Sequence, residues 1–222
     1  MADHAGVMAK TILGRRAALR GLALALLPLR LPLPAGPAVP AAAVDEPVAA
    51  SLAGQLLVAS RDLSDTGFAE TVVYLMVQDA GGGVGLVVNR PGREVPLSEI
   101  LAALGLDAAG AVGRITVHEG GPVEPGRPFL LHTPDLMLKD SKALPGGTAL
   151  TNDPAMLRAI GAGRGPAHHL FAFGYVGWAG GQLEAEIARG DWFAIPSELA
   201  LIFAAEPARS WERALQRQPT AL

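Results

Sequence analysis

From residue 52 onward, short apolar runs alternate with turns rich in glycine and proline. Runs rich in valine and leucine at 55–60, 71–77 and 84–89 are each bounded by turn-forming residues, a pattern typical of buried β-strands. The glycines between the last two runs predict a hairpin. The same pattern predicts four later strands, at 114–120, 128–133, 168–176 and 191–196.

Helices are predicted where apolar spacing changes and capping residues fit. In 96–106, Ser98 is a candidate cap and Gly105 a stop. In 153–163, Asp153 is the predicted cap, with Pro154 in the first turn. The remaining predicted helices are 182–189, 197–204 and 207–216.

Strands and helices do not alternate regularly enough for a doubly wound sheet. We therefore predict the α+β fold class: a single domain with a mixed, strongly curved sheet, of pseudo-barrel form, and peripheral helices. The domain is expected at 54–222, after a linker at 44–53, and no internal repeat or second domain is visible.

Residues 1–43 read as an export leader rather than as part of the fold. A basic region ending at Arg20 precedes a Leu/Ala/Pro stretch and a run of alanines at 41–43, the order typical of a cleaved secretory leader. The pair Arg15-Arg16 resembles a twin-arginine signal, although Arg30 interrupts the apolar stretch. The alternatives are a disordered extension or a gene start upstream of the true one at Met8.

The distribution of charge along the chain bears on which classes of partner it can bind. The first 43 residues hold five basic side chains and one acidic one, a net +4; because the whole chain carries −3, residues 44–222 carry −7. An acidic body makes a nucleic-acid partner unexpected. The chain has no cysteine, which excludes disulfides and thiolate chemistry, and no uninterrupted apolar run of about 20 residues that predicts a permanent membrane span.

Two polar motifs follow strands. The glycine run at 81–83 precedes a strand and lacks a Gly-Lys-Ser/Thr ending, so it predicts a connecting loop rather than a phosphate loop. Asn89 and Arg90 stand at a strand end and offer an amide and a guanidinium fork for a carboxylate or phosphate. The alternative is that Asn89 caps a turn and Arg90 is solvated.

Histidines raise the question of a metal site. His118 and Glu119 adjoin a turn at a predicted strand end, and His132 lies in the next predicted strand. If those strands paired, the two histidines could face each other, although alternation sends Glu119 to the opposite face. Histidines satisfied by backbone carbonyls are the expected outcome, with a metal-assisted hydrolase as the rival.

The stretch 173–193 contains several glycines around a Trp and a Gln. There is no Gly-x-Ser-x-Gly nucleophile, and Glu184 and Glu186 are spaced to face different sides of a helix, where they complement its dipole. Folding accounts for most of this stretch. Trp178 and Gln182 border a helix N-terminus that could receive an anion, so the stretch is either structural or a ligand or partner surface.

Five segments together, GQLLVASRDLSDTGFAETVVYL, GVGLVVNRP, HEGGPV, LLH and GYVGWAGGQLEAEI, resemble the YqgE/AlgH family of bacterial proteins, also called UPF0301 or DUF179. The resemblance runs from about Gly54 to Phe203. It implies a single α+β domain with a sheet folded into a pseudo-barrel. Some members are described as transcriptional regulators, named for an effect on alginate synthesis, and members look cytoplasmic, unlike a chain with a leader.

We therefore expect a non-enzymatic domain that binds a small ligand or a protein partner, or regulates, exported to the periplasm. A metal-assisted hydrolase and a cytoplasmic transcriptional regulator remain the alternatives, and no catalytic residue, metal or cofactor is predicted. The candidate ligand- or partner-binding residues are Asn89, Arg90, Gly120, Gly121, Pro122, Trp178, Gln182 and Glu184.

Overall fold

The computed structural model describes residues 51–63 and 67–218. The predicted leader and residues 44–50 of the linker lie outside this range. The strands are β1 Leu56–Ala59, β2 Val72–Asp79, β3 Gly82–Val87, β4 Pro91–Pro96, β5 Arg114–Glu119, β6 Val123–His132, β7 Lys142–Leu144, β8 Thr148–Thr151, β9 His169–Ala179 and β10 Trp192–Ile195. The helices are α2 Leu97–Ala103, α3 Pro154–Gly161, α4 Gln182–Ala188, α5 Leu199–Ile202 and α6 Ser210–Leu215, with a 3-10 turn at Pro207–Arg209.

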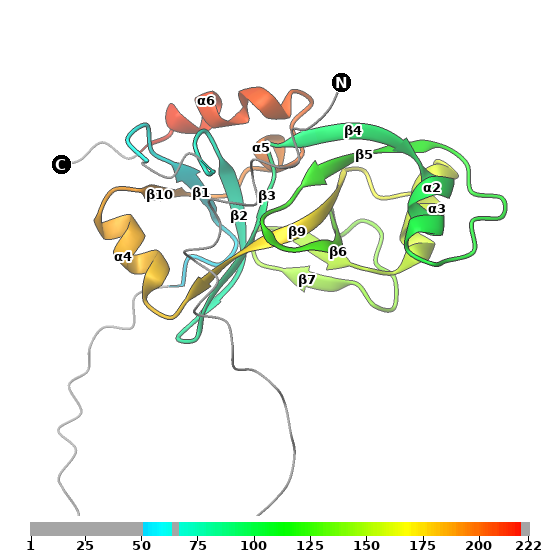
Figure 1. Cartoon of the computed structure of the whole chain (residues 1–222), viewed down its shortest axis with the longest axis horizontal. Coiled ribbons are helices and arrows are strands. Elements are labelled where there is room, and N and C mark those ends of the chain that lie inside the picture. Colours follow the sequence, from blue (N-terminus) through cyan, green and yellow to red (C-terminus); the bar gives the residue numbers. More distant parts are fainter. Residues whose placement is uncertain (1–50, 64–66, 219–222) are drawn as a thin grey trace, which may run out of the picture. The chain divides into compact units, whose positions relative to one another are not determined.

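Strand β9 organises the sheet (Figure 1). Along one edge it pairs antiparallel with β6. Along its other edge its first half pairs in parallel with β5 and its second half antiparallel with β3. The strand order is β10-β1-β2-β3-β9-β6-β8-β7, with β4 joined to β5, and the remaining pairings are antiparallel. The sheet is therefore mixed and curved, as the sequence predicts.

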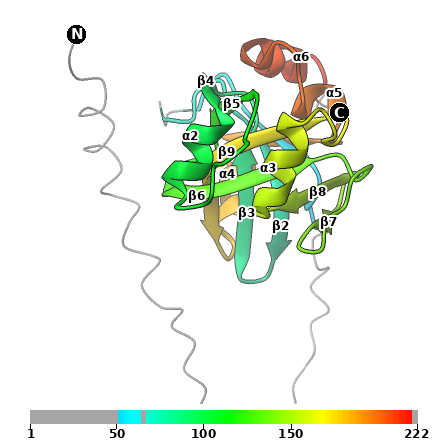
Figure 2. The same cartoon turned by 90° about the vertical axis from the view of Figure 1, so that its right-hand side faces the viewer.

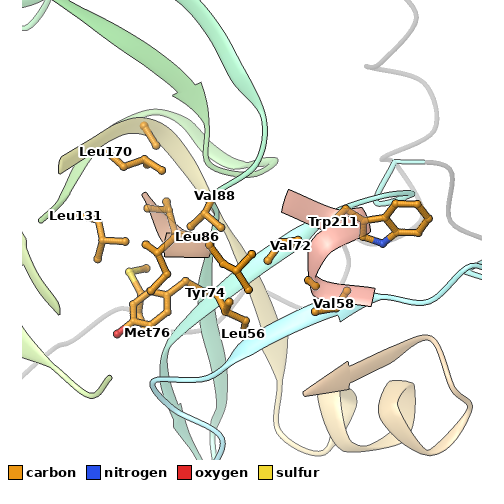
Figure 3. Close-up of a cluster of buried hydrophobic side chains, with 14 of the residues drawn as sticks. Leu56, Val58, Val72, Tyr74, Met76, Leu86, Val88, Leu131, Leu170 and Trp211 are labelled. Atoms are coloured by element: carbon orange, nitrogen blue, oxygen red, sulfur yellow. The ribbon is translucent and has the colours of Figure 1, made fainter. Parts of the chain in front are cut away.

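The central strands are buried on both faces, which explains why they read as continuous apolar runs. In β2, alternate residues separate cleanly: Tyr74 joins the largest cluster, which also contains Leu86 and Leu131, whereas Val73 and Leu75 join a second cluster on the opposite face. Figure 3 shows the largest cluster, with the Tyr74 ring among aliphatic side chains.

The helices lie around the sheet and cover separate parts of it (Figures 1 and 2). Helix α6 contributes Trp211 to the largest cluster, and α4 contributes Leu183 to the second. Helices α2 and α3 pack on a third cluster around Phe171 of β9. In the described part of the chain, no helix is both long enough and apolar enough to cross a membrane.

The sequence-based predictions hold for most long elements. The hairpin between β2 and β3 forms, and Asp153 caps α3 by accepting a hydrogen bond from the Ala155 amide at 2.8 Å. Helix α2 differs: its N-cap is Pro96, and Ser98 does not cap it. Strand β9 continues to Ala179, so Trp178 lies inside a strand rather than after one.

Candidate functional site

The Gly120-Gly121 turn lies where four strands meet. The Gly120 carbonyl accepts a hydrogen bond from the Val87 amide at 2.9 Å, and its own amide donates to the Phe173 carbonyl at 2.8 Å. A Cβ atom on Gly121, whose φ is +149°, would lie 2.3 Å from the Tyr175 carbonyl carbon. Only glycine fits where the backbones come this close. Through these contacts the two glycines link β3, β5, β6 and β9. Pro122 follows them, exposed at the start of β6.

Asn89 and Arg90 tie the end of β3 to the segment preceding β2. Asn89 is 6% exposed; its Oδ1 accepts from the Val72 amide at 2.8 Å and its Nδ2 donates to the Glu70 carbonyl at 2.8 Å. Arg90 Nη2 donates to the Thr71 hydroxyl at 2.7 Å. The clamped segment contains Glu70 in the left-handed region, with φ of 56°. Both side chains therefore hold a strained backbone in place.

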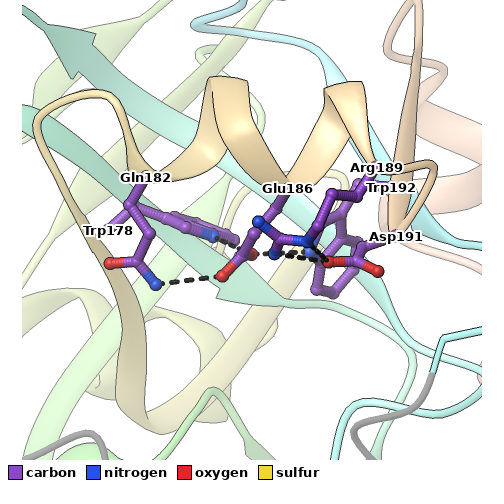
Figure 4. A network of polar contacts seen from close by, with 6 residues as sticks. All are labelled: Trp178, Gln182, Glu186, Arg189, Asp191 and Trp192. Carbon is purple, nitrogen blue, oxygen red and sulfur yellow. Dashed lines mark hydrogen bonds and ion pairs between the residues drawn. The ribbon is translucent and has the colours of Figure 1, made fainter.

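A buried carboxylate, Glu186, lies beneath helix α4 (Figure 4). It is 4% exposed, and its Oε2 accepts from the indole N–H of Trp178 at 2.9 Å and of Trp192 at 3.0 Å. Gln182 Nε2 donates to Oε1 at 3.0 Å. The predicted role of Glu186, complementing the helix dipole, is wrong, because its carboxylate lies inside the fold. There the carboxylate accepts hydrogen bonds from side chains of β9, α4 and β10 and so joins these three elements.

The other predicted residues of this region also have internal partners. The Gln182 Oε1 accepts from the Ala179 amide at 3.1 Å. Glu184 is exposed and accepts from Gln78 Nε2 at 2.7 Å, across to β2. As predicted, Glu184 and Glu186 lie on different sides of the helix.

The eight predicted binding residues fall into two regions rather than one. Gly83 pairs with Trp178 at one end of β3, whereas Asn89 follows its other end. Six residues of extended chain span about 20 Å. A single small ligand therefore cannot contact Asn89 and Trp178 at once, and the Gly120-Gly121 turn lies between them, beside Val87 and Tyr175. A binding role for any of the eight residues stays a prediction.

The histidines do not assemble as the metal hypothesis requires. Strand β9 separates β5 from β6, so the strands carrying His118 and His132 do not pair. His118 is in register with Ala172, whereas His132 is in register with His169, the opposite alternation of β9. The two histidines therefore point to opposite faces. Among the described residues, no three His, Asp or Glu side chains are arranged to hold a metal ion.

His118 and His132 are instead buried side chains of the fold, and His169 is partly buried. His132 is fully buried, and its Nδ1 lies 2.8 Å from the Thr133 carbonyl. Burial lowers the pKa of His118 below its ordinary value, with backbone hydrogen bonds opposing the shift. Burial also lowers the pKa of His169, and neighbouring His132 and His168 add to the effect. His132 meets the expectation of a carbonyl partner at Nδ1, whereas its buried Nε2 and the buried Nδ1 atoms of His118 and His169 have no hydrogen-bond partner among the described residues.

A depression of about 330 Å³ is lined by residues of β6, β7 and β8 and of the segment that leads into α3, and none of the eight predicted binding residues lines it. Phe129 and Leu150 line it together with the charged side chains of Arg127 and Lys142. The other lining residues are Asp140, Thr151, Asn152, Asp153 and Pro154. Its lining combines apolar side chains with charged side chains of both signs.

A closed set of contacts fixes Arg127 at this depression. Its guanidinium carbon lies 5.3 Å from the centre of the Phe129 ring, and Nη1 lies 3.2 Å from Glu124 Oε2. The Tyr175 ring packs edge-on against Phe129 at 5.9 Å, and its hydroxyl donates to Glu124 at 3.3 Å. Burial and the Glu124 charge raise the pKa of Tyr175.

The sequence analysis missed Glu124, Arg127 and Phe129 as a group because they lie at or beside an unusual bulge in β6. Residues 124–127 bulge from β6 where its register with β9 shifts, and Glu124 adopts a φ of 46°. The text GGPVEPGRP contains three prolines and three glycines, which reads as a loop rather than a strand. A bulge with a non-glycine residue in the left-handed region is the feature that marks it.

Comparison with known proteins adds the family. A sequence profile described as AlgH-like, DUF179, matches residues 56–222. A UPF0301 protein of Methylococcus capsulatus is 42% identical over 167 residues, covering 75% of this chain and 91% of that protein. A UPF0301 protein of Methylocella silvestris is 42% identical over 176 residues, covering 76% and 85%.

Two solved structures are similar. The solution structure of the AlgH protein from Pseudomonas aeruginosa is 34% identical, with a TM-score of 0.62, and the match covers 76% of this chain and 88% of that one. A crystal structure of a protein from Corynebacterium diphtheriae is 20% identical, with a TM-score of 0.58 over 75% and 87%, and supports the fold alone.

Proposed function

Because this chain belongs to the AlgH-like DUF179 (UPF0301) family, we propose that it is a non-enzymatic binding domain, which acts by holding a small ligand or a protein partner. Any regulatory effect would depend on whether that ligand or partner is bound. The solved AlgH protein shares the fold.

The observation that supports this proposal is how the polar groups are used. The side chains of Asn89 and Glu186 make hydrogen bonds that fix the backbone or join elements. Four charged side chains, those of Arg127, Asp140, Lys142 and Asp153, instead line one depression together with Phe129 and Leu150. Such an arrangement holds a molecule in place by charge and apolar contact.

The predicted binding residues keep a part in this proposal. Asn89, Gly120 and Gly121 shape the scaffold, since their atoms contact its backbone. Pro122 and Glu184 are exposed and are proposed as partner contacts. If a variant that combines E184A with a substitution of Pro122 still binds every partner of the wild-type protein, the assignment of these two residues as partner contacts is wrong.

The metal-assisted hydrolase finds less support. It requires His118, Glu119 and His132 around one ion, and the sheet sends the two histidines to opposite faces. Titration with Zn²⁺ under calorimetry tests it: binding at one ion per chain that H118A abolishes would revive the hydrolase.

Export to the periplasm is the second part of the proposal, and it rests on the leader pattern at 1–43. The cytoplasmic regulator is the alternative. The intact mass of the protein from its own host separates the two. A chain beginning near Val44 supports export, and a full-length chain with salt-sensitive DNA affinity supports the regulator.

Native mass measurement on the same sample tests binding. An added mass that disappears on denaturation, or a second protein at fixed stoichiometry, supports a binding domain. A bare chain at every stage of gentle purification contradicts it.

A further inference from the structure

Two histidines on neighbouring strands stand directly opposite each other: His132 of β6 pairs with His169 of β9. Each has a buried ring nitrogen that has no hydrogen-bond partner among the described residues. We propose that these two rings form a site for one transition-metal cation of the class that prefers nitrogen ligands, such as Zn²⁺. The site is separate from the one that the hydrolase hypothesis requires, which includes His118, and it does not depend on the proposed binding function.

Strand pairing brings the two rings close together. The Thr133 amide donates to the His168 carbonyl at 3.0 Å, so Thr133 and His168 form a hydrogen-bonded pair. The next pair along an antiparallel ladder is a non-hydrogen-bonded one, whose Cα atoms lie about 4.5 Å apart and whose side chains are closest. His132 and His169 form that next pair. Their rings therefore stand side by side on one face of the sheet.

The hydrogen bond of His132 sets the position of its proton. Its Nδ1 lies 2.8 Å from the Thr133 carbonyl, which only accepts, so Nδ1 carries the proton and Nε2 of the neutral ring holds a lone pair. The side chain is fully buried. Leu130 and Phe171, two residues along each strand, belong to the third apolar cluster and offer no side-chain donor. A metal cation satisfies such a lone pair.

Both rings lean toward the end of the ladder where the chain leaves β6 and enters β9. Nδ1 of His132 contacts the carbonyl of the next residue, and Pro166 lies beside the His169 ring. Asp135 lies at the same end, because its Oδ2 accepts from the Ala167 amide at 2.8 Å, and its charge interacts with His132. A carboxylate near two neutral nitrogens favours a cation over an anion.

The ligand set decides the class of ion. Imidazole nitrogen suits Zn, Cu and Ni, whereas Mg²⁺ takes oxygen ligands. In the described part of the chain no third His, Asp or Glu completes the set, so water would fill the remaining positions. His169 is partly exposed, which gives the ion a side open to solvent. We expect a Zn²⁺ Kd of about 10–100 µM, because the site has half the protein ligands of a structural zinc site.

The test is a calorimetric titration of the full chain with Zn²⁺, together with ¹⁵N NMR of the imidazole nitrogens. We expect one ion per chain, shifts at Nε2 of His132 and Nδ1 of His169, and no binding of Mg²⁺. H169Q and H132Q should each raise the Zn²⁺ Kd by about tenfold or more. Circular dichroism checks that the variants are folded. If H132Q unfolds, because His132 is fully buried, the partly exposed H169Q decides the test.

H168Q is the matched control, because His168 precedes His169 but points to the opposite face, where its ring stacks on Phe203 at 5.8 Å. Its Zn²⁺ Kd should equal that of the wild-type protein. A lack of saturable Zn²⁺ binding, binding that H168Q abolishes, or a folded H169Q protein with wild-type affinity would each overturn this inference. Binding that H118A abolishes would also overturn it and support the hydrolase instead. None of these results bears on the proposed binding function, which the native mass measurement tests.

Discussion

Replacing Glu186 by glutamine tests the buried carboxylate with almost no change in shape. Both indole N–H groups donate to Oε2, so the new amide must turn its oxygen toward Trp178 and Trp192. Its NH₂ then occupies the place of Oε1, 3.0 Å from Gln182 Nε2, which is also a donor. Gln182 cannot invert without losing the bond from the Ala179 amide.

The substitution therefore converts one charge-assisted hydrogen bond into a donor–donor contact and weakens two others. We expect a loss of about 1–3 kcal/mol in the free energy of unfolding. For a domain of this size, each kcal/mol lowers Tm by about 2–4 °C. Urea unfolding followed by circular dichroism measures the loss without relying on the fluorescence of the affected tryptophans.

A reciprocal exchange sharpens the test. Q182E alone places two carboxylates side by side and should also destabilise the fold, whereas E186Q with Q182E restores one donor facing one acceptor. The double variant should recover at least half of the loss of E186Q, a coupling that a double-mutant cycle isolates. E184Q, on the exposed side of α4, should stay within about 0.5 kcal/mol of wild type. A double variant no more stable than E186Q would refute the hydrogen-bond pattern.

Three further predictions concern the scaffold. The pKa values of His118 and His169 in the folded state lie below the ordinary 6.5, so the folded state binds fewer protons than the unfolded state. The free energy of unfolding should therefore be full above pH 6.5 and fall as the pH drops below it. Unfolding measured from pH 8 to 5 checks this, and H169Q should make the fall less steep. G121A should cost more than about 3 kcal/mol, because its Cβ would clash with backbone, whereas G147A, with φ of +77° and open space, should cost about 1 kcal/mol by thermal unfolding. N89A should lower the free energy of unfolding by about 2–3 kcal/mol and speed limited proteolysis of the segment before β2. Equal cleavage of N89A and the wild-type protein would contradict the role of Asn89 in holding that segment.

The long elements were predictable because they depend on local pattern. Strands buried on both faces gave unbroken apolar runs, and Asp153-Pro154 marked the start of α3. The missed strands lack that signal. β4 reads PGREVP, with most of its residues exposed and a proline at each end, and β7 and β8 have only three and four residues. Their pairing comes from neighbours distant in sequence, which no local pattern contains.

The candidate residues were predictable as unusual positions, but their roles were not. Asn89 at a strand end reads equally well as a ligand contact or as a backbone clamp, because an amide serves both. Deciding between them requires knowing that residues 70–72 lie beside it. Likewise, Glu186 follows Glu184 by two residues, and only the positions of Trp178 and Trp192 show that one of the two is buried.

The motifs that this chain shares with its family have structural roles in the fold. HEGGPV joins four strands through glycines, and VVNRP clamps a strained segment to the end of β3. GWAGGQLEAEI places a carboxylate between two indoles. Sequences that keep these motifs keep the scaffold, whatever they bind, so resemblance in the motifs argues for the fold rather than for an activity. Differences in ligand should therefore arise in segments outside them, and the bulge at 124–127 and the loops that line the depression are the places to exchange between relatives first.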